Sequence, residues 1–121
     1  MASVDALLVS ALENIAPVWN SVKENEHQDQ AEEPEIYFVF NYSTVGIGYA
    51  DNEPTGERFL IQVHLFTPLA TNLTRLKKQT KAALHKAGFT WPETVDASDE
   101  KSRHIVFESQ YVEGVDFDGT L

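Results

Sequence analysis

The sequence contains no cysteine in its 121 residues. A disulfide framework, a thiolate metal site and a cysteine nucleophile are therefore excluded, and the absence fits a reducing compartment. No apolar run approaches the roughly 20 residues that a helix needs to cross a bilayer. The first residues also lack the basic and then apolar pattern of a signal peptide. We expect a soluble protein with no membrane partner.

Basic residues are also scarce. Nine Lys and Arg stand against 19 Asp and Glu, which gives a formal net charge of -10. A surface of this charge repels phosphates, so the composition argues against tight binding to bare DNA. Yet five of the nine basic residues fall between residues 72 and 87, which makes that segment the exception in an acidic chain.

Known catalytic motifs are missing as well. The chain has no Gly-x-Ser-x-Gly, no phosphate-binding loop and no His-Glu-x-x-His. The acidic stretch over residues 23–35 lacks the glycine of a calcium loop, and we expect it to be a solvated loop. His64 and His104 fall on expected strands and can face each other across a sheet, but zinc typically takes three or four protein ligands. We expect no enzyme, no cofactor and no metal.

Two segments show apolar residues at helical spacing. The first helix is predicted from Val4 to Ile15, with Ser3 as its N-cap, and a further turn is expected over residues 18–22. The second helix is predicted over residues 72–87, with Thr71 or Asn72 as its N-cap. Gly88 stands where a left-handed C-cap is usual.

Alternating and β-branched residues predict the strands. They cover residues 36–42, 44–49, 58–67 and 103–112, with a short extended piece over 89–91. The first three are expected to form an antiparallel meander, covered on one face by both helices. The fold class is thus a two-layer α+β domain with a mainly antiparallel sheet of about four strands. We place the domain over residues 1–112 and a flexible acidic tail over 113–121.

The face of the sheet opposite the helices is expected to stay partly apolar and uncovered, unless the N-terminal segment or the tail folds over it. Contiguous apolar patches of this kind mark contacts with partners. The candidate contact residues on this face are Tyr37, Val39, Leu60 and Phe66. The hairpin with Gly46, Gly48 and Tyr49 is a further candidate contact.

The second helix carries Arg75, Lys78 and Lys81 away from its apolar stripe. One interpretation is a solvated face whose lysines favour the negative C-terminal end of the helix. The other is a subunit seam, in which this face meets an acidic surface on a second copy. Head-to-tail pairing of unlike surfaces closes into rings.

The segment "QVHLFTP" followed by "TNLTRLKKQTKAALHKAGF", an acidic loop and "RHIVFESQYV" resembles the tail terminator, or tail completion, proteins of long-tailed bacteriophages and prophages. The preceding "PEIYFVFNYSTVGIGYADNE" is similar to the first hairpin of that family. The resemblance extends from Val4 to Val112. It implies a small α+β domain without catalytic activity that forms a ring, generally of six subunits, at the head-proximal end of the tail tube.

The resemblance also implies the partners and the location. A terminator ends tube polymerisation and contacts the tail tube protein on one side and a head-completion or connector protein on the other. DNA only passes through the lumen of the ring. The protein would reside in the virion, and in the host cytoplasm during assembly. The alternative that we keep is a small bacterial ligand-binding or regulatory α+β module.

Overall fold

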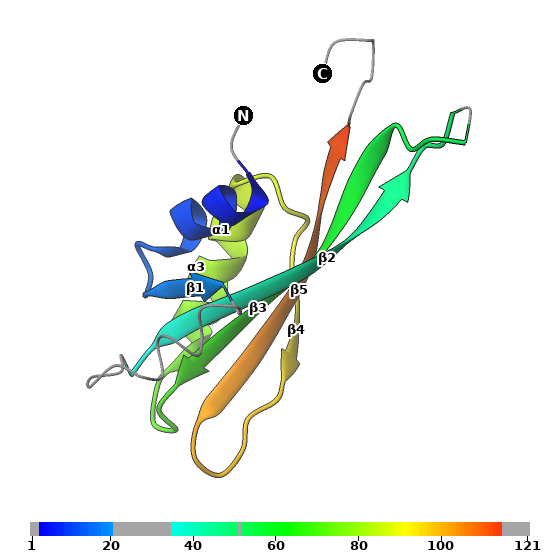
Figure 1. Cartoon of the computed structure of the whole chain (residues 1–121). Coiled ribbons are helices and arrows are strands. Elements are labelled where there is room, and N and C mark those ends of the chain that lie inside the picture. The colour runs from blue at the N-terminus through cyan, green and yellow to red at the C-terminus, as the bar shows by residue number, and fades with distance from the viewer. Residues whose placement is uncertain (1–2, 21–34, 51, 115–121) are drawn as a thin grey trace.

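The computed structural model describes residues 3–20, 35–50 and 52–114. Over these ranges the chain forms one five-stranded sheet with two helices on the same face (Figure 1). The helices are α1 (Val4–Leu12) and α3 (Leu73–Lys86), and the strands are β1 (Val18–Asn20), β2 (Tyr37–Ile47), β3 (Gly56–Thr67), β4 (Glu93–Asp96) and β5 (Arg103–Gly114). The expected α+β class with both helices on one face is confirmed.

The sheet differs from the expected one in strand number and direction. Its order is β1-β2-β3-β5-β4, which makes five strands over the described ranges instead of about four. The pairs β2–β3, β3–β5 and β4–β5 are antiparallel, whereas β1 runs parallel to β2. The sheet is therefore mixed, with its three long strands in the centre and two short strands at the edges.

Both helices have the caps that their sequences predict. The Ser3 hydroxyl accepts a hydrogen bond from the Ala6 amide at 3.1 Å, so α1 begins at Val4. The Asn72 side chain accepts from the Thr74 amide at 3.1 Å and begins α3. Gly88 has a φ of 105°, the left-handed conformation expected after a helix. The end of α1 differs, since the helix stops at Leu12 and not at Ile15.

The expected extra helical turn after Pro17 is wrong where the structure describes it. Residues Val18–Asn20 form β1, and the Phe38 amide donates to the Pro17 carbonyl at 2.8 Å. Proline disfavours helix at the residue before it, and Val18 and Trp19 are residue types that suit a strand. Pairing with Phe38–Phe40 therefore decides the conformation of this segment.

The expected strands over 36–42 and 44–49 are one strand. The register of β2 against β3 runs unbroken from Tyr37 opposite Phe66 to Ile47 opposite Gly56. No glycine or proline separates the two expected strands, so the ladder continues through Ser43. The three-strand meander is thus a single long hairpin.

The segment after α3 also holds a strand that its sequence does not suggest. Residues Glu93–Asp96, expected as polar loop, form β4 against β5. β5 itself continues two residues past the expected end at Val112, to Gly114. The remaining tail, 115–121, lies outside the described residues, as does the expected acidic loop except for Glu35.

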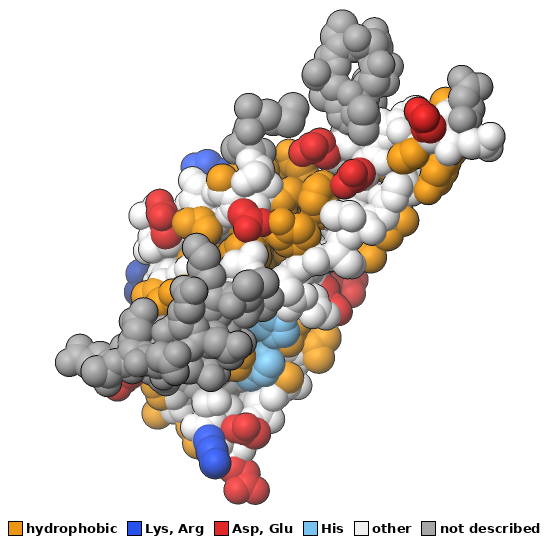
Figure 2. All heavy atoms as spheres, in the orientation of Figure 1, with side chains coloured by type: hydrophobic (Ala, Val, Ile, Leu, Met, Phe, Trp, Pro, Cys, Tyr) orange, Lys and Arg blue, Asp and Glu red, His pale blue; other side chains and the backbone are white. Residues whose placement is uncertain are grey.

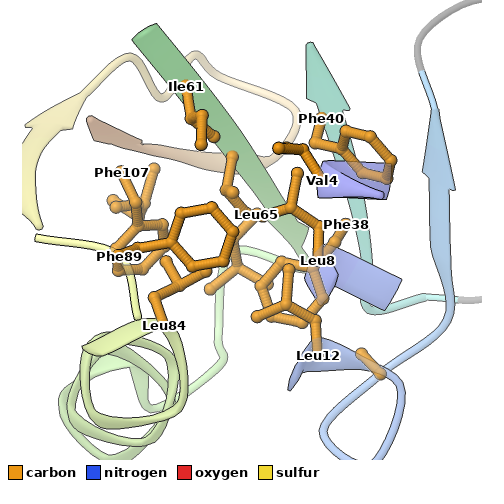
Figure 3. Close-up of a cluster of buried hydrophobic side chains, with 13 residues drawn as sticks. Val4, Leu8, Leu12, Phe38, Phe40, Ile61, Leu65, Leu84, Phe89 and Phe107 are labelled. Carbon is orange, nitrogen blue, oxygen red and sulfur yellow. The ribbon is translucent and has the colours of Figure 1, made fainter. Parts of the chain in front are cut away.

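The core lies between the helices and one face of the sheet (Figure 3). Val4, Leu8 and Leu12 recur every four residues along α1, so one side of that helix points into the core. Leu84 comes from α3, and the strands and the Phe89 loop supply the remaining large side chains. These are Phe38, Phe40, Ile61, Val63, Leu65, Phe89, Ile105 and Phe107, all at most 2% exposed.

We expect Leu84→Ala to lower the free energy of unfolding by about 2–5 kcal/mol, because it removes buried methyl groups and leaves a cavity. Leu69→Ala is the matched control, since Leu69 is 46% exposed, and it should change the value by no more than about 0.5 kcal/mol. Urea denaturation followed by circular dichroism measures both. Equal effects of the two substitutions would contradict the described core.

Candidate functional site on the open face of the sheet

The face of the sheet opposite α1 and α3, called the open face here, carries every second residue of each strand. The register arranges these residues in rows that cross the sheet. Tyr37, Phe66 and His104 form one row. The next rows are Val39, His64, Val106 and Val95, then Asn41, Gln62, Glu108 and Glu93, then Ser43, Leu60 and Gln110. The structure therefore places Tyr37, Val39, Leu60 and Phe66, the predicted contact residues of the sheet, on one face.

These four side chains do not form a continuous exposed apolar patch, which corrects the expectation. Val39 is 4% exposed and is buried, as is its row neighbour Val106. Tyr37 and Phe66 are half-buried. Leu60, at 39% exposed, is the large apolar side chain of the four that faces solvent.

Aromatic rings at one end of the open face stack in a line. Trp19 meets Tyr37 edge-on at 5.9 Å between ring centroids, and Tyr37 stacks on Phe66 at 5.0 Å. Phe66 in turn stacks on His104 at 4.3 Å. Contacts of this geometry add stability beyond area burial, so ring contacts hold the strands together at this end of the face.

Two histidines extend the line into a hydrogen-bonded chain. His64 Nδ1 and His104 Nε2 lie 2.8 Å apart, and Asn41 Nδ2 lies 3.1 Å from His64 Nε2. Because the assigned Asn41 nitrogen only donates, His64 Nε2 accepts, and its Nδ1 hydrogen is left to donate to His104. Burial, and then the nearby His104, lower the pKa of His64 below its usual value. Figure 2 shows histidine side chains reaching the surface.

A polar hollow of about 740 Å³ lies farther along the open face. The row of Asn41, Gln62, Glu108 and Glu93 lines it, and Trp91 stands beside that row, 57% exposed. Glu93 and Glu108 are direct partners across β4 and β5, and both are exposed. The sequence alone did not reveal this pair, because β4 has no strand pattern of its own and its register depends on β5.

The far ends of β2, β3 and β5 project beyond the helices and form an arm, defined as residues 43–50, 52–60 and 110–114 (Figure 1). Exposed apolar side chains lie along it, and Figure 2 shows hydrophobic and acidic side chains there. The exposed apolar side chains of the arm are Val45, Tyr49, Leu60 and Val112. Gly48 turns the chain at a φ of 62°. A Cβ on Gly46 would lie 3.0 Å from Tyr49 Oη and from Pro54 Cβ, so both predicted glycines shape the hairpin end.

Asp5 of α1 joins the base of the arm to the helix layer. Its carboxylate accepts hydrogen bonds from the Tyr42 hydroxyl and, at 3.2 Å, from Asn20 Nδ2. The bond from Tyr42 raises the pKa of that hydroxyl above its usual value, with burial and the Asp5 charge adding to the effect. One carboxylate thus links α1, β1 and β2.

The predicted basic residues lie on the outer side of α3, away from the sheet. Arg75 and Lys78 are exposed and Lys81 is half-buried, whereas Thr80 and Leu84 face the core. His85 contacts the Trp91 ring edge-on at 5.6 Å. The C-terminal end of α3 therefore approaches the edge of the hollow through His85 and Trp91, whereas Arg75 and Lys78 are exposed to solvent on the helix.

Within residues 3–20, 35–50 and 52–114, no three or more His, Cys, Asp or Glu side chains are grouped so as to hold a metal ion. No helix of the described chain is both long and apolar enough to cross a membrane.

Comparison with known proteins gives the fold and no family. No family model and no curated protein matches this sequence. A solved structure whose protein name describes no function has a TM-score of 0.52, with 12% sequence identity over 93% of this chain and 96% of that chain. At that identity the similarity shows a shared fold alone.

We expect His64 to titrate below 6.5, with stability falling as the pH drops. The folded state holds fewer protons than the unfolded state below pH 6.5, so acid favours unfolding. His64→Gln should flatten the dependence of the unfolding free energy on pH between about 5 and 7. His104→Gln should raise the pKa of His64, because it removes His104, one of the two causes that lower this pKa. NMR titration and urea denaturation measure these effects, and a stability that rises toward pH 5 would contradict them.

Proposed function

We propose that this chain is a viral structural protein of the tail terminator type, which assembles as a ring at the head-proximal end of a phage tail tube. The observation that carries the proposal is the arm, which projects beyond the helices with Val45, Tyr49 and Val112 exposed. The arm consists of three paired strands, and the apolar side chains that it exposes form a surface of the kind that marks contacts with partners. An element of this kind gains stability from a neighbouring subunit.

The distribution of charge supports assembly from unlike surfaces. The outer side of α3 is basic in a chain of net charge -10. A subunit that carries one basic and one acidic surface favours head-to-tail contacts between copies. These contacts form a closed ring when the rotations from each copy to the next add up to a full turn. In a ring of six, the excess of carboxylates elsewhere lets DNA pass through the lumen without binding to it.

The partners follow from that position. One rim of the ring contacts the tail tube protein and ends its polymerisation, and the other contacts the head-completion or connector protein. The sequence segments that resemble the terminator family cover α1, the β2–β3 hairpin, α3 and β5. The location is the virion, with the host cytoplasm as the site of assembly, and the role requires no catalysis.

A second candidate is a small bacterial ligand-binding or regulatory module. The polar hollow beside Trp91 favours it, because ligand sites combine a concave surface with a few convergent polar groups. The hollow is wide and exposed, however, and its lining is mainly polar. A protein surface therefore fits it better than a small apolar ligand does.

Cryo-electron microscopy of tails is expected to show this chain as a ring at the head-proximal end. Phage particles made without it should carry tubes of uncontrolled length, because nothing stops tube growth. A chain that is absent from the head-tail junction would sink the proposal, and binding of a small metabolite by the purified chain would favour the second candidate.

We expect Arg75→Glu combined with Lys78→Glu to lower ring formation at least tenfold and to leave the monomer folded. Both side chains are exposed on α3, so their replacement removes no core contact. Lys101→Glu, in the loop between β4 and β5, is the matched control for a change of charge at an exposed site. Sedimentation velocity measures assembly and circular dichroism measures folding. Unchanged assembly of the double variant would remove α3 from the interface.

A further inference from the structure

Glu93 and Glu108 form a pair of exposed like charges on the open face. Glu93 and Glu108 are directly opposite each other on neighbouring strands, where like charges are destabilising. The basic residue on the open face of β3 is Arg58, four residues from Gln62, the row neighbour of Glu108. That separation is about 14 Å along the strand, beyond the Debye length of about 8 Å at physiological salt.

The groups around the pair fit a cationic side chain. Asn41 and Gln62 continue the row with amide groups, which both donate and accept hydrogen bonds. Carboxylates accept two parallel hydrogen bonds from a guanidinium group, and a Trp face attracts cations. The lining of the hollow therefore suits Arg and Lys side chains better than an apolar segment.

The same chain carries a basic surface that is short enough to fit along this row. Arg75, Lys78 and Lys81 recur every three residues along α3, and they span about 9 Å of helix. The row from Asn41 to Glu93 crosses four strands, or about 14 Å. The two surfaces lie on opposite sides of the sheet, so they cannot meet within one chain.

We infer that the glutamate row on the open face of one copy receives the basic side of α3 from a second copy. The inference rests on the proposed ring and supplies the acidic surface of its seam. Each copy presents its helix layer to one neighbour and its open face to the other, a heterologous contact of the kind that builds rings. Charge complementarity here orients the subunits and excludes the reverse packing of two open faces.

A charge swap tests the pairing. Glu93→Lys with Glu108→Lys should weaken self-association at least tenfold, as should Arg75→Glu with Lys78→Glu. All four substitutions in one chain should restore association to within about threefold of the original, because each contact again joins opposite charges. An equimolar mixture of the two double variants should also assemble. Glu93→Gln with Glu108→Gln is the matched control that removes charge without reversing it, and it should fall between the original chain and the reversed one.

Sedimentation velocity over a concentration series measures association, and urea denaturation confirms that each variant is folded. The pairing would be overturned if the variant with all four substitutions stays dissociated. It would also be overturned if the Glu93→Lys, Glu108→Lys variant assembles normally. An original chain that never self-associates would overturn it as well. If the Glu93→Lys, Glu108→Lys variant loses association and the Arg75→Glu, Lys78→Glu variant does not, the pairing is wrong and the glutamate row binds another cation. Loss of association of the original chain on addition of EDTA would then identify that cation as a divalent ion. Tail microscopy judges the proposed function separately, so a failed seam and a failed terminator role give different results.

Discussion

Burial of one face of the sheet under α1 and α3 is the constraint on which the other features depend. Side chains alternate along a strand, so covering one face assigns every second residue to the core and the rest to the open face. Phe38 and Phe40 are thereby buried under the helices, while Tyr37 and Asn41 reach the other side. The rows of the open face, including the histidine chain and the glutamate pair, are products of that single choice.

Element length gives the molecule its shape. β3 has 12 residues and spans about 40 Å, whereas α1 has nine residues and spans about 14 Å. The helices are too short to cover the whole face of the long strands. The arm is therefore a direct consequence of the difference in length between the strands and the helices, and no special sequence is needed to project it. Its exposed apolar side chains set it apart from an ordinary solvated hairpin.

The sequence predicted those features that depend on local chemistry. Ser3 and Asn72 act as caps and Gly88 ends a helix, because each acts on backbone groups within a few residues. The placement of His64 and His104 on one face of the sheet, where they lie in adjacent rows and share a hydrogen bond, followed from strand alternation. The predictions of elements failed where long-range pairing decides.

β1 and β4 show why. Each is a short edge strand of three or four residues, and neither has enough apolar alternation to predict a strand by itself. Their conformation comes from a neighbour distant in sequence, and so does the register that sets Glu93 against Glu108. The polar half of the open face could therefore not be assembled from the sequence, although the apolar half could.

The carboxylate of Asp5 has a consequence for binding entropy. By accepting from both Tyr42 and Asn20, it fixes the base of the arm to α1 and to β1. An arm held at its base is already close to one orientation before any neighbour arrives. Less conformational freedom is then lost when the arm is captured, so more of the contact energy remains as affinity. A carboxylate with two hydrogen bonds thus preorganises an element that lies mostly beyond it.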